Sequence, residues 1–87
     1  MPRLALDWGD LAYADRAGDR PAMVFLHGTG CDSADWAETF AHLPQPGPRV
    51  IGVDFRGHGE SGIPARPFAL ADLAGDVLAL LAAERIS

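Results

Sequence analysis

Two stretches decide the fold of this chain: residues 22–30, Ala22-Met23-Val24-Phe25-Leu26-His27-Gly28-Thr29-Gly30, and residues 50–61, Val50-Ile51-Gly52-Val53-Asp54-Phe55-Arg56-Gly57-His58-Gly59-Glu60-Ser61. Each is an apolar run that is followed directly by a glycine-rich turn. A continuous apolar run of this length is typical of a strand that is covered on both faces of a sheet. Glycine gives the turn unusual backbone dihedrals and leaves room for close approach. We therefore expect buried strands over residues 22–26 and 49–54, each ending in a tight turn.

The segments around these strands predict the element order β-β-β-α-β-α, an antiparallel hairpin leading into a parallel, doubly wound sheet. The further expected elements are strands over 3–8 and 11–16 around a Gly9-Asp10 turn, a turn over 17–21, a helix over 34–43 capped by Asp32 or Ser33, and a helix over 69–85.

The second helix carries an apolar stripe at helical spacing, which predicts the face that packs on the sheet. The residues expected to be buried are Leu70, Leu73, Val77, Leu78, Leu80 and Leu81. The charged residues Asp72, Asp76 and Glu84 are expected to face solvent.

Charge and composition exclude several classes of partner. Twelve acidic residues against seven basic ones give a net charge of −5, which argues against nucleic acid and against an anionic membrane surface. The single cysteine, Cys31, excludes an internal disulfide. We find neither a signal peptide nor an apolar run of membrane-spanning length, so we expect a cytoplasmic protein with no membrane partner.

The turn at residues 27–30 follows a buried strand, where a backbone N–H could stabilise negative charge developing on a carbonyl oxygen. From this segment alone, a strand-to-helix turn that binds nothing is an equally good interpretation. The second turn changes the balance. Residues 54–61 match the pattern D-x-R-G-x-G-x-S, and they follow the next parallel strand.

The two motifs in this order resemble the N-terminal segment of the α/β-hydrolase fold superfamily, with residues 1–87 forming the N-terminal portion of one domain. The resemblance implies that the backbone N–H of Thr29 is one oxyanion-hole donor, in a turn shaped by His27, Gly28 and Gly30. It also implies that the residues of the second motif are scaffold: a charged pair of Asp54 with Arg56, a tight turn at Gly57 and Gly59, and a loop anchor at Ser61.

The same resemblance predicts a serine-type hydrolase acting on an ester, a lactone or a related acyl bond. We expect no cofactor, and no metal site either, because the three histidines are not spaced like zinc ligands and Cys31 is a lone thiol. Its nucleophile, base and acid would lie outside these residues, so we expect this chain alone to be inactive and its partner to be the remainder of the domain. Dehalogenase and epoxide-hydrolase members usually continue the His-Gly pair with Asn-Pro or Phe-Pro, and Thr29-Gly30 fits neither.

The resemblance also predicts the strand order 1-2-4-3, which leaves the apolar strand over residues 22–26 as an open edge. Exposed apolar edges template aggregation. We therefore expect the 87-residue chain to be incomplete on its own, and insoluble or self-associating.

Other candidate groups have simpler interpretations. Ser61 lacks the second glycine of G-x-S-x-G and lies seven residues after the strand, so it is not the nucleophile. His27 is predicted to be a buried, hydrogen-bonded turn residue, His42 a surface residue, and His58 a loop residue between two glycines. Cys31 follows a glycine near a helix start, a setting that can lower a thiol pKa, but without a base beside it we expect an inert thiol.

Two alternatives to the hydrolase remain open at this point. One is a truncated fold retained as a binding or dimerisation module that uses the apolar edge. The other is a dinucleotide-binding domain, because Gly28-x-Gly30-x-x-Ser33 follows a strand and Asp54 ends the next one. The dinucleotide pattern lacks its third glycine and gives His27 no role.

Overall fold

A computed structural model describes residues 1–28 and 30–86 of the chain. Its elements are β1 (Arg3–Leu6), β2 (Gly9–Arg16), β3 (Asp19–Leu26), the short 3-10 helix η1 (Ser33–Trp36), α1 (Ala37–His42), β4 (Pro48–Val53) and α2 (Leu70–Ala83). This confirms the predicted element order and α/β fold class. The second helix agrees with the prediction to within two residues at each end.

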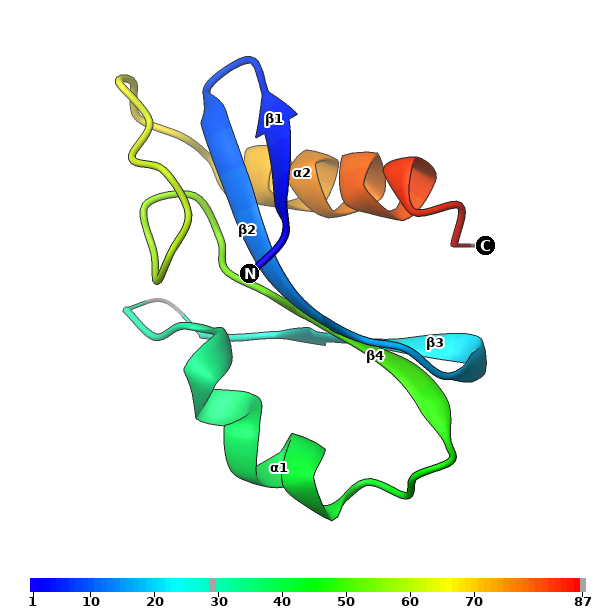
Figure 1. Cartoon of the computed structure of the whole chain (residues 1–87). Helices are drawn as coiled ribbons and strands as arrows, with labels where there is room; N and C mark the ends of the chain where they lie inside the picture. The colour runs from blue at the N-terminus through cyan, green and yellow to red at the C-terminus, as the bar shows by residue number, and fades with distance from the viewer. Residues whose placement is uncertain (29, 87) are drawn as a thin grey trace.

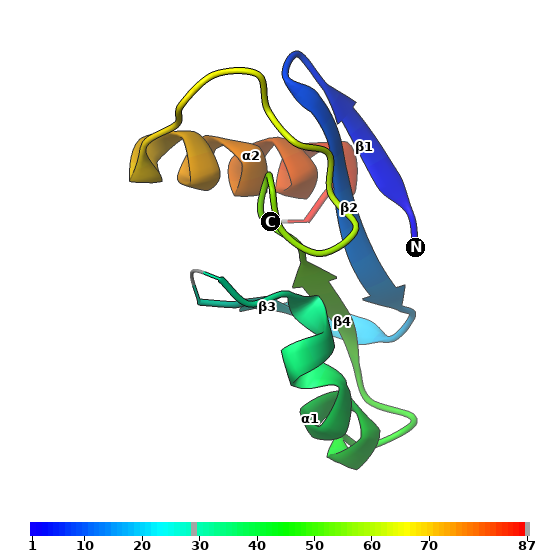
Figure 2. The ribbon, with the colours of Figure 1, turned by 90° about the vertical axis from the view of Figure 1, so that its left-hand side faces the viewer.

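The four strands form one sheet in the order β1-β2-β4-β3. β1 pairs antiparallel with β2, β2 antiparallel with β4, and β3 parallel with β4. The predicted order is therefore confirmed, with β3 at the sheet edge in the described part of the chain. Figure 1 shows α2 on one side of the sheet and α1 on the other, and Figure 2 gives the same arrangement from the side.

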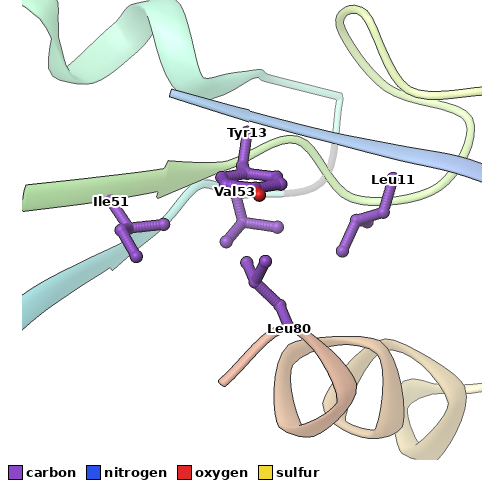
Figure 3. Close-up of a cluster of buried hydrophobic side chains, with 5 residues drawn as sticks. All are labelled: Leu11, Tyr13, Ile51, Val53 and Leu80. Atoms are coloured by element: carbon purple, nitrogen blue, oxygen red, sulfur yellow. The ribbon is translucent and has the colours of Figure 1, made fainter. Parts of the chain in front are cut away.

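The main core lies between the sheet and α2. Its buried side chains come from β2, β4 and α2, and converge as Figure 3 shows: Leu11, Tyr13, Ile51, Val53 and Leu80. Alternate residues of each strand supply them because successive side chains point to opposite faces of a sheet. Burial of these side chains is the hydrophobic term that holds α2 in place.

An aromatic cluster fills the opposite face, under η1 and α1. The Phe25 ring lies 5.0 Å from both the Trp36 ring and the Phe40 ring, centroid to centroid. A Cβ at Gly52 would come within 3.0 Å of the Phe40 ring. The glycine in the middle of β4 is thus what lets Phe40 pack closely against the sheet.

Two strand boundaries differ from the sequence prediction. The hairpin turn is Asp7-Trp8 rather than Gly9-Asp10, because Leu6 pairs with Gly9 and makes a two-residue loop. β3 begins at Asp19, inside the predicted turn, because the Asp19 N–H donates to the Gly47 carbonyl at 2.8 Å. β3 is also partly exposed rather than covered on both faces, and in the described residues it lies at the sheet edge with β4 as its neighbour.

The helices also differ from the prediction. The predicted helix over 34–43 is divided into η1 and α1, with Asp32 as the cap: its carboxylate accepts the Ala34 N–H at 2.9 Å. On α2, Leu70 and Leu78 are 81% and 66% exposed, whereas the predicted stripe included both. Asp76, predicted to face solvent, is buried, because it pairs with an arginine on another element.

Candidate functional site

The two glycine-rich turns lie side by side at one edge of the sheet. Leu26 at the end of β3 pairs with Val53 at the end of β4, so the following residues leave the sheet at the same level. In open α/β sheets, ligands bind outside the carboxyl ends of the parallel strands. We call residues 27, 28 and 30 the His-Gly turn and residues 54–61 the Asp54 loop.

His27 joins the first turn to the second. Its ring is buried, and Nε2 accepts the backbone N–H of Phe55 at 3.0 Å. A neutral ring that accepts through Nε2 carries its proton on Nδ1, and Nδ1 lies 2.7 Å from the Gly28 carbonyl oxygen, to which it donates. The prediction of a buried, hydrogen-bonded turn residue is confirmed. Both ring nitrogens are engaged, so His27 has no nitrogen free to act as a general base.

His58 makes the matching connection in the opposite direction. Its Nε2 accepts the backbone N–H of Gly30 at 3.0 Å, and its Nδ1 lies 3.0 Å from the Arg56 carbonyl oxygen. The His27 and His58 ring centroids are 5.0 Å apart. The sequence pattern assigned His58 no role; its position between two glycines places it in the loop but does not reveal its partner.

The glycines of the His-Gly turn leave its outer side open. Gly30 has φ +82°, in the region that favours glycine. A Cβ at Gly28 or at Gly30 would find no atom within 4 Å, so there is room for a ligand to reach the backbone. The turn is closed by the Cys31 N–H, which donates to the Gly28 carbonyl at 3.1 Å. The predicted oxyanion donor, the N–H of Thr29, lies outside the described residues.

Asp54 organises the second loop from the inside. It is 1% exposed, and its Oδ1 accepts the Ser33 N–H at 2.6 Å while its Oδ2 accepts the Glu60 N–H at 2.9 Å. With both oxygens engaged by backbone, this carboxylate is not available to a ribose hydroxyl, which removes the main support for the dinucleotide interpretation. The carboxylate also fixes the start of η1, so it links the Asp54 loop to the segment after the His-Gly turn.

Ser61 anchors the far end of the same loop. Its buried hydroxyl accepts the Ala12 N–H at 2.7 Å and donates to the Asp54 carbonyl oxygen at 2.6 Å. The predicted anchor role is thus confirmed. A hydroxyl buried against β2 and donating to a backbone carbonyl is not placed to attack a substrate.

The predicted pair of Asp54 with Arg56 is wrong. Arg56 instead forms two hydrogen bonds with Asp76 of α2, from Nε to Oδ2 at 2.9 Å and from Nη2 to Oδ1 at 2.8 Å. Trp8 Nε1 donates to the same carboxylate at 3.2 Å, and the guanidinium carbon lies 4.8 Å from the Trp8 ring centroid. Asp76 keeps the Arg56 pKa above its ordinary value, so the pair stays charged and acts as scaffold.

The remaining candidates take no part in this arrangement. His42 is exposed at the end of α1, as predicted. A hydrogen bond with Asp35 raises the pKa of the exposed Cys31 thiol, so the setting does not activate it.

Within residues 1–28 and 30–86, no three histidine, cysteine or acidic side chains are grouped to hold a metal. In the same residues, no helix has the length and apolar character needed to cross a membrane.

Comparison with known proteins gives a consistent picture. A family model described as alpha/beta hydrolase fold matches residues 21–86. A relative in Acinetobacter baylyi, 3-oxoadipate enol-lactonase 2, is 40% identical over 78 residues, which are 90% of this chain and 27% of the relative.

Solved structures match over similar spans. An esterase from Exiguobacterium antarcticum has a TM-score of 0.83 at 26% identity, over 95% of this chain and 31% of the esterase. An enol-lactonase from Burkholderia xenovorans has a TM-score of 0.73 at 34% identity, over 92% of this chain and 32% of the lactonase. The chain thus spans about a quarter to a third of the length of these proteins.

Proposed function

Because the chain belongs to the α/β-hydrolase fold family, we propose that it is the N-terminal part of a serine-type hydrolase that cleaves an ester, a lactone or a related acyl bond. The observation that carries the proposal is the His-Gly turn: it leaves a parallel strand at its carboxyl end, is open on its outer side, and is braced by the Asp54 loop. A braced turn with accessible backbone suits the binding of a developing oxyanion.

In this proposal the chain supplies one part of the catalytic machinery. A serine oxygen attacks the substrate carbonyl, and the Thr29 N–H donates to the carbonyl oxygen as it becomes negative. The sequence contains no G-x-S-x-G, so the serine, the histidine base and the acid belong to the remainder of the hydrolase domain, which is the proposed partner. The substrate class is supported by the lactonase and esterase relatives.

A chimeric enzyme tests the proposal directly. The segment of the A. baylyi lactonase that aligns with this chain is replaced by the 87 residues, and hydrolysis of 3-oxoadipate enol-lactone is measured. We expect the chimera to hydrolyse the lactone and the 87-residue chain alone to release no p-nitrophenol from p-nitrophenyl acetate above buffer.

Two substitutions in the chimera isolate the oxyanion donor. Thr29→Pro removes the backbone N–H, and we expect kcat to fall by about 10²- to 10³-fold, the usual loss for one oxyanion-hole donor. Thr29→Ala keeps the N–H and should retain activity within about threefold. A folded chimera without activity, or equal activity in the two variants, would contradict the proposed role.

A non-enzymatic binding or dimerisation module is the second candidate. It is favoured by the apolar edge of β3, where Met23 and Leu26 are 39% and 45% exposed. Denaturing intact-mass measurement of native material separates the candidates. A second, larger polypeptide containing G-x-S-x-G supports the hydrolase, whereas a single species of 9.2 kDa supports the module.

A further inference from the structure

We propose that His58 is a positioning residue for the His-Gly turn, holding it as a neutral imidazole that accepts the Gly30 N–H; this inference rests on the proposed function for its catalytic meaning. The bond is 3.0 Å long and joins groups 28 residues apart in the sequence. It acts on the residue directly after Thr29, so it constrains the peptide unit that follows the one carrying the proposed oxyanion donor.

The ring nitrogens fix the form that His58 must take. Nε2 can accept the Gly30 N–H only without a proton, so a neutral ring carries its hydrogen on Nδ1. Nδ1 lies 3.0 Å from the Arg56 carbonyl oxygen, which accepts that hydrogen. The Asp54 loop therefore selects the tautomer, because its own carbonyl stabilises a proton on the nitrogen that faces it. This is the arrangement by which a second partner fixes histidine orientation in functional sites.

The two histidines form a reciprocal brace. His27, from the His-Gly turn, accepts the Phe55 N–H of the Asp54 loop, and His58, from the Asp54 loop, accepts the Gly30 N–H of the turn. The Asp54 carboxylate adds a third link between the two segments by accepting the Ser33 N–H at 2.6 Å. The two histidine bonds tie each turn to the other, and the His58 bond fixes the direction of the Gly30 N–H.

The charged and titratable groups near His58 are engaged with partners of their own. The titratable group that faces His58 from the His-Gly turn is His27, with ring centroids 5.0 Å apart. On its own loop, the Arg56 guanidinium is directed to Asp76, and the Asp54 carboxylate is engaged by the Ser33 and Glu60 N–H groups. A guanidinium only donates, and the Asp54 carboxylate is already engaged, so His58 Nε2 is the acceptor for the Gly30 N–H.

The first test measures the tautomer in the 87-residue chain. Histidine-ring 15N NMR, in solution or in the solid state for associated chain, reports which nitrogen is protonated. We expect His58 to carry its proton on Nδ1 at neutral pH, with a nitrogen–nitrogen coupling from Nε2 to the Gly30 amide. His27 should show the same pattern with Phe55, and His42 serves as the exposed reference. A His58 ring protonated on Nε2 would overturn the proposal.

The second test asks whether the His58 ring nitrogen, rather than the size of the side chain, holds the Gly30 N–H. His58→Leu removes the acceptor, and hydrogen exchange of the Gly30 amide should accelerate about tenfold, the value of one net hydrogen bond. His58→Gln offers an amide oxygen as acceptor and should restore the protection of the Gly30 amide from exchange. His42→Leu, at the exposed histidine, is the control and should leave that protection unchanged. Equal Gly30 exchange in the wild-type chain and the His58→Leu variant would contradict the brace.

Neither readout depends on hydrolysis, so the two proposals fail separately. An inactive chimera with an Nδ1-protonated His58 would remove the hydrolase proposal and leave the brace. An active chimera with an Nε2-protonated His58 would support the hydrolase proposal and overturn the brace.

Discussion

Arg56 and Asp76 form a two-point ion pair that joins the loop after β4 to the middle of α2, with side chains only 12% and 7% exposed. Trp8 from the first hairpin turn completes the contact through its Nε1 hydrogen bond and the face of its ring. Three segments far apart in the sequence therefore meet at one charged pair. Such a pair is costly to break because the remaining charge is left buried.

We expect Asp76→Asn to lower the free energy of unfolding by about 3 kcal/mol, because it leaves the Arg56 guanidinium without its counter-charge. Urea unfolding followed by tryptophan fluorescence measures the change. Asp10→Asn, at an exposed position of β2, is the matched control and should shift stability by less than about 0.5 kcal/mol. Equal effects of the two substitutions would show that the ion pair does not stabilise the fold.

The sequence was a good guide to the strands and a poor one to this pair. Apolar runs followed by glycine turns predicted β3 and β4 because that pattern is local, and the order of elements along the chain predicted their parallel arrangement. Helical periodicity placed Asp76 outside because the pattern treats every carboxylate as solvated. Its partner lies 20 residues earlier, on another element. The resemblance of the second motif to the hydrolase family likewise suggested Asp54 as the partner of Arg56, whereas the fold turns Asp54 towards backbone N–H groups.

The same limit applies to the candidate site. The His-Gly turn was predictable because its residues are consecutive. The bonds from His27 to Phe55 and from Gly30 to His58 each span 28 residues, and only the meeting of two strand ends creates them. Helical spacing also could not predict that Leu70 and Leu78 are exposed, because it identifies an apolar face but not which of its residues reach the sheet.

Two glycine-to-alanine substitutions should have opposite signs. Gly59 has φ +50°, and a Cβ there would lie 2.4 Å from the Asp54 carboxylate oxygen, so Gly59→Ala should destabilise the chain by about 2 kcal/mol. Gly75 lies inside α2, and a Cβ there would have nothing within 4 Å, so Gly75→Ala should stabilise by up to about 1 kcal/mol. The urea unfolding midpoints of both variants, compared with that of the wild-type chain, measure the sign of each effect. A stabilising Gly59→Ala would mean that the loop packs differently around Asp54.

The only tyrosine in the sequence gives a pH test of the contact between β2 and α2. The Tyr13 hydroxyl donates to Glu84 Oε2 at 2.6 Å, and that bond, with burial, raises the pKa of Tyr13 to about 12. Because the pKa of folded Tyr13 is above the unfolded value of about 10, the contact stabilises the fold fully below pH ~10. The stabilisation should be lost as pH rises through about 12.

Absorbance titration of the phenolate measures the raised pKa of Tyr13, and the sequence has no other tyrosine that would contribute to the signal. Unfolded chain in urea is the control and should titrate near pH ~10. Tyr13→Phe should cost about 2 kcal/mol at neutral pH, because a hydrogen bond to a carboxylate is lost, and should remove the alkaline loss of stability. A native-chain midpoint equal to the urea midpoint would contradict the contact.

Ser61→Ala tests whether the serine of the second motif is structural. The substitution leaves the buried Ala12 N–H without its acceptor, and we expect a loss of about 2 kcal/mol in unfolding free energy. The wild-type chain should not react with a fluorophosphonate probe, measured by intact mass. A phosphonylated Ser61 in folded chain would show instead that its hydroxyl is accessible and nucleophilic.

Association of the chain should depend on the edge of β3. Met23 lies in this strand and is 39% exposed, and edge strands with apolar side chains pair with other edges. A lysine at such an edge opposes pairing because its charge must stay in water, so Met23→Lys should shift the chain towards monomer in sedimentation velocity. Leu78→Lys adds the same charge on α2, where the leucine is 66% exposed, and should leave association unchanged. If both substitutions shift the chain towards monomer equally, net charge and general surface hydrophobicity control association. If neither does, β3 is not the contact between copies of the chain, and the proposal that its apolar edge is a binding surface is wrong.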